Sequence, residues 1–281
     1  MTALVDAHLH LWDPRRFRYP WLAGLPALDR PFGPAELDTG GHRLTGAVFV
    51  EAGRAPAQAV DEIRWVERFA AGLPALRGAV AHADLERGGE VAADLRRLAA
   101  IPLVRGVRRN VQDEPPGFAT GPGHLDGVRL LAGHGFTADL CVRHAQLPEI
   151  TELVARVPQV TFVLDHLGKP PVRDGGLDPW REHLRRLAGH PNVVCKLSGL
   201  TTEAGPGRGE PADLLPYLRH ALAEFGPDRC LFGGDWPVAT LTSRYDHWVA
   251  VVLEALAGHP PAHREQVLAG TATRVYRLPP A

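Results

Sequence analysis

The sequence predicts a (β/α)8 barrel, and two patterns carry this prediction. Short apolar or β-branched runs recur at intervals of roughly 30 residues, and segments of helical period separate most of them. Eight such units fit one barrel domain, so we expect residues 1–281 to form a single domain. A doubly wound open sheet is the alternative, but it usually carries a glycine-rich phosphate turn where this sequence has His-Leu-His.

The predicted strands are rich in Val, Ile, Leu and Phe and end at Gly, Pro or polar residues. They are Leu4–His10, Leu44–Ala52, Leu76–Leu85, Val104–Asn110, Thr137–His144, Thr161–Gly168, Asn192–Gly199 and Cys230–Pro237. The predicted helices carry apolar residues on one face, and several begin with Pro or Asp. They are Ala57–Ala71, Gly89–Ala100, Gly123–Ala132, Pro148–Val157, Pro179–Ala188, Ala212–Phe225 and Tyr245–Ala257. Two longer segments, 12–43 and 201–211, follow strand ends, so we expect them to cover or line a binding site.

Composition favours small-molecule chemistry. The net charge is −1 with acids and bases interspersed, which gives no electrostatic footprint for nucleic acid or an anionic membrane. No run approaches the roughly 18 apolar residues of a membrane helix, and a cytoplasmic location is the simplest expectation. The three cysteines, Cys141, Cys195 and Cys230, lie in apolar runs and are predicted to be buried, reduced thiols.

Polar residues gather at the carboxyl ends of the predicted strands. Since these ends meet at one mouth of a parallel barrel, we expect their side chains to converge there. The residues are His8, His10, Glu51, His82, Arg108, Asn110, His144, His166, Lys196, Ser198 and Asp235.

His8 and His10 alternate on the first strand and point to one side. Such a pair suits a divalent metal or a shared oxyanion. Asp235 ends the eighth strand, which neighbours the first in a closed barrel, so the three side chains are predicted to form one cluster. A carboxylate there can activate water as a general base or complete a metal shell.

Eight motifs together resemble the sugar lactonases of the amidohydrolase superfamily, with 2-pyrone-4,6-dicarboxylate lactonases more distant. They are Val-Asp-Ala-His-Leu-His-Leu-Trp-Asp, Val-Phe-Val-Glu-Ala, Val-Ala-His-Ala, Gly-Val-Arg-Arg, Asp-Leu-Cys-Val-Arg-His, Val-Leu-Asp-His-Leu-Gly-Lys-Pro, Cys-Lys-Leu-Ser-Gly and Phe-Gly-Gly-Asp-Trp-Pro-Val. The resemblance spans nearly the whole chain. It implies a distorted (β/α)8 barrel that opens a cyclic ester, a sugar-derived lactone, by attack of water.

The resemblance also implies roles for individual residues. Asp235 would be the general base, and His8, His10 and His166 would polarise the lactone carbonyl directly or through a metal. A second group of metal-ligand type is Glu51, His82 and His144, with a polar network around substrate hydroxyls as its alternative. Whether the enzyme requires a divalent metal stays open, and zinc is the first candidate. The alternative set of ligands is His8, His10 and Asp235. A two-metal site of the kind bridged by a carboxylated lysine is disfavoured, because no lysine lies on the first five predicted strands.

The next predictions concern substrate contacts and rest on residue type alone. Aromatic rings can stack on a sugar ring, and basic or amide groups can donate to its hydroxyl or carboxylate groups. The aromatic candidates, for which loop or core packing is the alternative, are Trp12, Tyr19, Trp21 and Trp236. The donors are Arg108, Asn110 and Lys169, while Lys196 is predicted to pair with Asp235 or face the substrate.

Two other functions compete with the lactonase. One is a zinc-dependent decarboxylase or hydratase of the same superfamily, and the other is a non-catalytic protein that binds sugar acids. The sequence leaves the lactone's ring size and stereochemistry open, and a homodimer stays an open alternative for the oligomeric state.

Overall fold

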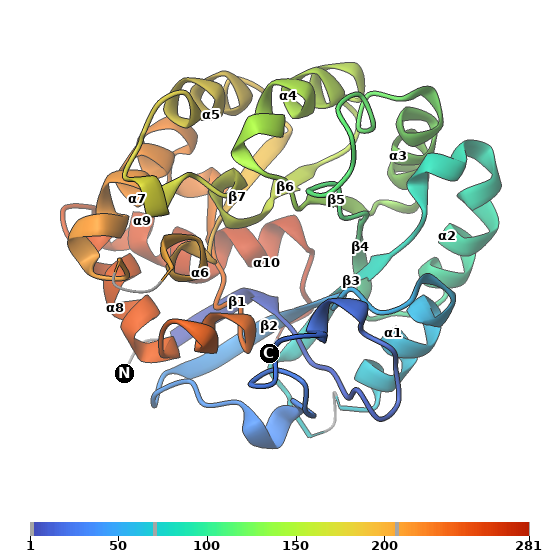
Figure 1. The fold of residues 1–281 in the computed structure, drawn as a ribbon, viewed down its shortest axis with the longest axis horizontal. Helices are drawn as coiled ribbons and strands as arrows, with labels where there is room; N and C mark the ends of the chain where they lie inside the picture. Colours follow the sequence, from blue (N-terminus) through green and yellow to red (C-terminus); the bar gives the residue numbers. More distant parts are fainter. Residues whose placement is uncertain (1–2, 70–71, 206–207, 281) are drawn as a thin grey trace.

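The computed structural model describes residues 3–69, 72–205 and 208–280, where eight parallel strands form one sheet in chain order. Each strand pairs with the next one along the chain. The strands are β1 Ala3–Leu9, β2 Arg43–Val50, β3 Leu76–His82, β4 Val104–Arg108, β5 Thr137–Leu140, β6 Phe162–Leu164, β7 Val193–Leu197 and β8 Cys230–Phe232. Figure 1 shows the strands as a ring with most helices outside it, which confirms the predicted barrel.

The helices that surround the strands bury apolar residues at helical spacing. In α4, for example, Leu147, Ile150, Leu153 and Val154 are buried. The helices are α1 Ala59–Glu67, α2 Ala92–Ala99, α3 Pro122–His134, α4 Leu147–Arg156, α5 Trp180–Ala188, α6 Leu200–Ala204, α7 Pro211–Phe225, α8 Tyr245–Ala255, α9 Pro261–Glu265 and α10 Thr271–Val275. Among the described residues, no helix is long and apolar enough to cross a bilayer.

The ring closes between β1 and the segment that follows β8. The amide of His10 donates to the carbonyl of Trp236, and the amide of Asp235 donates to the carbonyl of His8, each at 2.8 Å. Leu9 and Trp236 form a parallel bridge at the same place. Asp235 is therefore held against the strand that carries both histidines.

A buried carboxylate fastens this closure from inside. Asp6 Oδ1 accepts hydrogen bonds from the amides of His8 at 2.9 Å and Gly234 at 2.8 Å, and Asp6 Oδ2 accepts one from the Tyr245 hydroxyl at 2.9 Å. A Cβ on Gly234 would lie 2.5 Å from Asp6 Oδ2 and 2.4 Å from the Tyr245 ring. Close approach of the two chain segments thus requires glycine at position 234.

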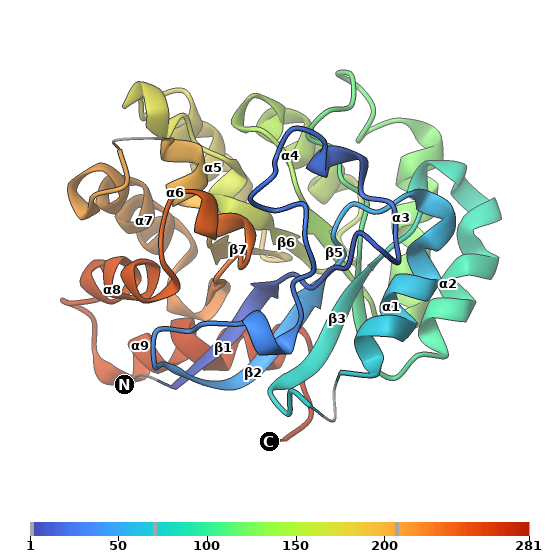
Figure 2. The same ribbon diagram turned by 60° about the horizontal axis from the view of Figure 1, so that its bottom comes forward.

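The barrel interior has an apolar layer at the end opposite the site, where α10 lies across the strands (Figures 1 and 2). This layer joins side chains of the strands to side chains of the C-terminal segment. Its members include Val5, Val48, Val80, Val163, Val194, Leu231, Ala272, Val275 and Tyr276. Beyond it, the inner side chains become charged.

The sequence-based boundaries differ from the structure in two respects. Predicted strands run past the true ends: β6 ends at Leu164 and β8 at Phe232, so His166 and Asp235 follow the strands rather than lying on them. Among the described residues, three helices were not predicted: α6, which lies where the second long segment was expected to be a loop, and α9 and α10, which a π-helical turn over Gln266–Gly270 joins. Residues 70–71 of the first predicted helix and 206–207 of the second predicted loop lie outside the described residues. All three cysteines are free and buried, as predicted.

Candidate active site

A cavity of about 410 Å³ opens at the carboxyl ends of the strands. His10, His166 and Asp235 line one end of it. Both long loops contribute as predicted, the first through Arg18, Pro20 and Trp21, and the second through Thr202 and Glu203. Figure 2 shows part of the first loop crossing above the strand ends.

Three histidines surround the Asp235 carboxylate at this end of the cavity. Asp235 Oδ1 lies 3.6 Å from His10 Nε2, 3.7 Å from His8 Nε2 and 3.9 Å from His166 Nε2. His8 is fully buried, and the other three residues are at least nine-tenths buried. The sequence-based expectation that His8, His10 and Asp235 form one cluster is confirmed by this geometry.

His166 is fixed by an unusual stretch of backbone. Its φ is +53°, in the left-handed region that non-glycine residues rarely adopt, and Asp235 has a φ of +54°. The Nδ1 atom of His166 lies 2.8 Å from the Ser198 hydroxyl, which orients the ring. Gly199, with φ +70°, passes so close that a Cβ there would lie 2.5 Å from the same Nδ1.

Burial and the neighbouring charges set the protonation states. Burial would raise the pKa of Asp235, but His166, His10 and His8 together hold it below its usual range. Burial lowers the pKa of His166 to about 4, although Asp235 and Asp165 oppose that shift. Burial also lowers the pKa of His8 well below its usual value. At neutral pH the site therefore combines an ionised carboxylate with neutral His8 and His166.

A layer of buried charges lies beneath these residues. The Lys196 ammonium contacts Asp139 Oδ2 at 2.7 Å and Asp165 Oδ1 at 2.8 Å. Arg108 links Asp165 to Glu51, with nitrogen–oxygen distances of 3.1 and 2.8 Å. Each charge is paired, which is how charged groups become tolerable inside a protein.

Polar groups form another part of the cavity wall. Lys169 Nζ donates to Gln112 Oε1 at 2.6 Å and lies 3.6 Å from Glu203 Oε1. Asn110 lines the same cavity, and its Oδ1 accepts a hydrogen bond from the Gln112 amide at 3.0 Å. Trp21 contributes a ring held by a 2.7 Å hydrogen bond from its Nε1 to the Ala52 carbonyl.

Four predicted substrate contacts need correction. Lys196 has no exposed surface and is enclosed by Asp139 and Asp165, so it neither faces the cavity nor pairs with Asp235. Trp236 is 3% exposed and packs edge to face against Phe32 outside the cavity wall.

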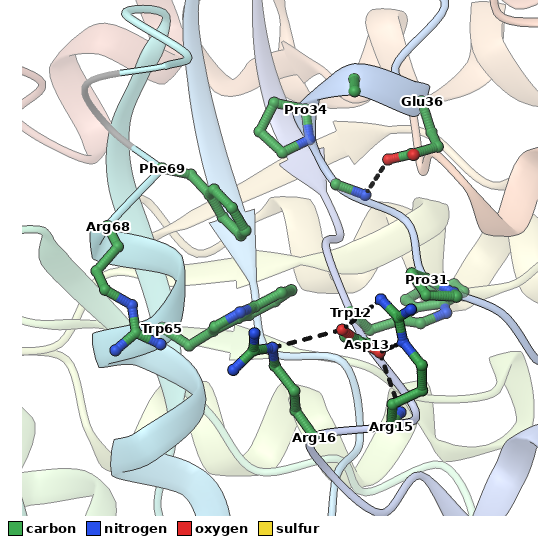
Figure 3. A pocket seen from close by; sticks show the side chains of 12 residues that line it. Trp12, Asp13, Arg15, Arg16, Pro31, Pro34, Glu36, Trp65, Arg68 and Phe69 are labelled. Atoms are coloured by element: carbon green, nitrogen blue, oxygen red, sulfur yellow. Dashed lines mark hydrogen bonds and ion pairs between the residues drawn. The ribbon is translucent and has the colours of Figure 1, made fainter.

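Trp12 also packs as a core residue. Its Nε1 donates to the carbonyls of Leu28 and Arg30, and its ring backs a different hollow of about 500 Å³ (Figure 3). That hollow lies between the first loop and α1 and includes none of the His and Asp side chains described above. Tyr19 is likewise buried, and its hydroxyl donates to Glu62 at 3.2 Å.

The second predicted metal group, Glu51, His82 and His144, is not assembled. Glu51 is engaged by Arg54 and Arg108, and His82 pairs with Asp84 at 2.8 Å. His144 begins a 3-10 turn after β5 and lines a separate surface hollow. These partners and positions keep the three ligand atoms apart.

His8, His10 and Asp235 fit a metal ion better. Among the residues that the structure describes, they are the one group of three whose ligand atoms lie within 4.8 Å of one another. Two imidazoles and a carboxylate are a donor set that zinc takes in proteins. His10 Nδ1 lies 2.8 Å from the Val50 carbonyl, to which it must donate, so His10 Nε2 is free to act as a ligand.

Sequence reasoning missed several buried acids. Asp139 and Asp165 flank Lys196, and Asp6 closes the barrel. A signal for two of them was present, because Asp139 interrupts an apolar predicted strand and Asp165 directly precedes His166. Of the two residues that bind Lys169, Gln112 lies in a loop and Glu203 in the short helix α6, and neither stands in a distinctive pattern.

Known proteins with similar sequences and structures agree with this architecture. The amidohydrolase family model matches residues 5–278. An L-fucono-1,5-lactonase of Burkholderia multivorans is 36% identical, with 98% of this chain and 96% of that protein covered. An L-fucono-1,5-lactonase of Burkholderia ambifaria is 32% identical, with 99% and 97% covered.

A crystal structure of a Burkholderia multivorans amidohydrolase with bound zinc superimposes with a TM-score of 0.87. It is 33% identical and is aligned over 99% of this chain and 100% of its own. The match of the family model over almost the whole chain, together with these full-length relatives, shows that the chain belongs to the amidohydrolase family and is a lactone hydrolase.

Proposed function

We propose that this enzyme hydrolyses a neutral, sugar-derived lactone, with Asp235 as the general base. The observation that carries the proposal is the ring of three histidine nitrogens, each within 3.9 Å of Asp235 Oδ1, at the end of a polar cavity. Ester hydrolysis needs a proton acceptor for water and donors for the oxyanion around one carbon, and this arrangement offers both.

The reaction proceeds through a tetrahedral intermediate. Water oxygen bonds to the lactone carbonyl carbon while its proton passes to Asp235, and the carbonyl oxygen becomes an oxyanion. With the Ser198 hydroxyl donating to Nδ1, His166 carries its hydrogen on Nε2 and donates it to that oxyanion. Collapse of the intermediate breaks the ring C–O bond, and the proton on Asp235 goes to the departing alkoxide.

A divalent ion held by His8, His10 and Asp235 would supply a Lewis acid for the same carbonyl. The residues Trp21, Arg108, Asn110 and Lys169 position the substrate. Trp21 offers an apolar face, and the polar wall offers donors and acceptors for ring hydroxyls.

The charges in the cavity support a neutral substrate rather than a dicarboxylate. Arg108 is already paired with Glu51 and Asp165, Arg54 with Glu51, and Lys169 with Gln112 and Glu203. Arg18 also lines the cavity and stands outside these pairs, so it could meet one carboxylate of a dianionic lactone, but the second carboxylate would have to break a pair or stay without a cation. Names of the full-length relatives point the same way, because L-fucono-1,5-lactone is a neutral polyhydroxylated lactone.

The test is a pH-indicator assay with L-fucono-1,5-lactone, other neutral aldonolactones and 2-pyrone-4,6-dicarboxylate. We expect turnover of at least one neutral lactone and none of the dicarboxylate. Asp235→Asn should abolish turnover while lactone binding persists, and Asp84→Asn, a carboxylate outside the cavity, should behave as the parent. Turnover of the dicarboxylate alone, or a fully active Asp235→Asn variant, would refute the proposal. No turnover of any lactone, combined with zinc-dependent decarboxylation of aromatic acids, would favour the decarboxylase alternative.

A further inference from the structure

Lys196 contacts the candidate site through one residue, His8. Its Nζ lies 3.2 Å from His8 Nδ1, and both side chains are fully buried. Lys196 Nζ also lies 2.7 Å from Asp139 Oδ2 and 2.8 Å from Asp165 Oδ1, and two carboxylates at these distances hold the group as an ammonium. An ammonium has three N–H donors and no acceptor.

The partners of this ammonium determine which His8 nitrogen carries hydrogen. Three acceptor atoms lie within 3.2 Å of Lys196 Nζ: Asp139 Oδ2, Asp165 Oδ1 and His8 Nδ1. Because Lys196 can only donate, a hydrogen bond between these two atoms makes His8 Nδ1 the acceptor. A neutral imidazole with an accepting Nδ1 carries its hydrogen on Nε2.

The other side of His8 is consistent with this tautomer. His8 Nε2 lies 3.1 Å from His10 Nε2, so one of these two atoms must donate. His10 Nδ1 donates to the Val50 carbonyl, which leaves His10 Nε2 as an acceptor. The hydrogen bonds thus run in one direction, from Lys196 through His8 and His10 to the backbone of β2.

We propose that Lys196 is a positioning residue that selects the Nε2–H tautomer of His8 and thereby sets how tightly the site holds a divalent metal. In this tautomer His8 donates within the His and Asp cluster but has no lone pair on Nε2 for a metal. Metal binding through that atom requires the hydrogen to move to Nδ1. Asp165 Oδ1, 3.3 Å from Nδ1, is the acceptor that the second tautomer would use.

Lys196 and Asp165 therefore act on His8 in opposite directions. The ammonium favours a metal-free His8, and the carboxylate favours the tautomer that ligates, in the manner of carboxylates behind zinc-bound histidines. The proposal rests on the candidate site, but neither readout below uses lactone turnover, so its failure is separate from a failure of the lactonase assignment.

The first readout is zinc affinity, measured by calorimetry on metal-stripped full-length protein. Lys196→Met should tighten zinc binding by about 10-fold or more, and Asp165→Asn should weaken it by a similar factor, the range found for groups behind metal ligands. Tyr276→Phe is the matched control: it removes a hydroxyl donor, 2.6 Å from Asp139 Oδ2, on the far side of the same ion pair. It should leave zinc affinity within about twofold of the parent, well below that range.

The second readout separates tautomer selection from simple charge effects. Two-bond proton–nitrogen NMR spectra of zinc-free, [¹⁵N]histidine-labelled protein show which ring nitrogen of His8 carries hydrogen, with His8→Gln for assignment. We expect Nε2–H in the parent and in Tyr276→Phe, and Nδ1–H in Lys196→Met. The parent spectrum does not depend on Lys196→Met, so the test stands even if that variant does not fold. Nδ1–H in the zinc-free parent would overturn the proposal, as would changed zinc affinity without a change of tautomer.

Discussion

Gly199→Ala should reduce lactone turnover because the added methyl group displaces the His166 ring. An alanine at φ +70° costs about 1–2 kcal/mol relative to glycine, which lowers Tm by about 2–4 °C for each kcal/mol in a chain of this size. The added Cβ would lie 2.5 Å from His166 Nδ1 and 2.7 Å from its Cγ. Normal contact begins near 3.4 Å, so the ring must retreat by roughly 1 Å, and a displacement of that size costs about 100-fold in rate.

Gly135→Ala separates backbone strain from displacement of the ring. Gly135 has φ 65° and ψ 23°, similar to 70° and −3° at Gly199, but a Cβ there meets nothing closer than 3.6 Å. Both variants should lose similar thermal stability, and only Gly199→Ala should lose lactone turnover. The assay compares kcat and Tm of the two variants and the parent. A Gly199→Ala enzyme with kcat within threefold of Gly135→Ala would refute the reasoning about His166.

Two further predictions test the buried acid beside the first loop and the corrected aromatic contacts. Burial raises the pKa of Glu62 from 4.5 to about 8, so the folded state keeps a proton that the unfolded chain releases, and this group costs stability as pH rises through that window. Glu62→Gln should therefore gain stability relative to the parent between pH 5 and pH 8, by up to about 4 kcal/mol in urea unfolding; an equal difference at both pH values would contradict it. Trp21→Ala should raise KM about 10-fold because its ring lines the cavity. Trp12→Phe should leave KM unchanged and lower the free energy of unfolding by about 1–3 kcal/mol, because Trp12 is a core residue. The reverse pattern of KM values in steady-state kinetics would identify Trp12 as the substrate contact.

The strand pattern could be predicted because it depends on local alternation of apolar and polar residues. Prediction placed the strand starts well but overran their ends, since polar site residues continue the chain in extended or left-handed conformations. His166 shows the difficulty: nothing in its neighbours announces a positive φ. The C-terminal helix was missed although Val267, Leu268, Ala272 and Val275 have helical spacing.

The cluster of His8, His10 and Asp235 could be predicted because it follows from barrel closure alone. The orientation of loop aromatics could not, since Trp12 and Trp21 share one segment and only tertiary packing decides which ring faces the cavity. Lys196 presents the same problem inside the barrel. Its partner depends on which of several inward carboxylates lies at the same height, and Asp139 and Asp165 occupy that level rather than Asp235.

Because the barrel closes between β1 and the segment after β8, the candidate site can form only late in the synthesis and folding of the chain. Asp6 and Gly234, which meet there, are 228 residues apart, and Asp235 follows directly. A nascent polypeptide cannot bring Asp235 beside His8 and His10 until nearly all of the barrel has left the ribosome. For the same reason, a circular permutant that opens a surface connection elsewhere should keep this cluster, whereas one that opens the chain between Phe232 and Asp235 would separate Asp235 from β8. Recovery of turnover during refolding therefore reports when the two ends of the barrel meet.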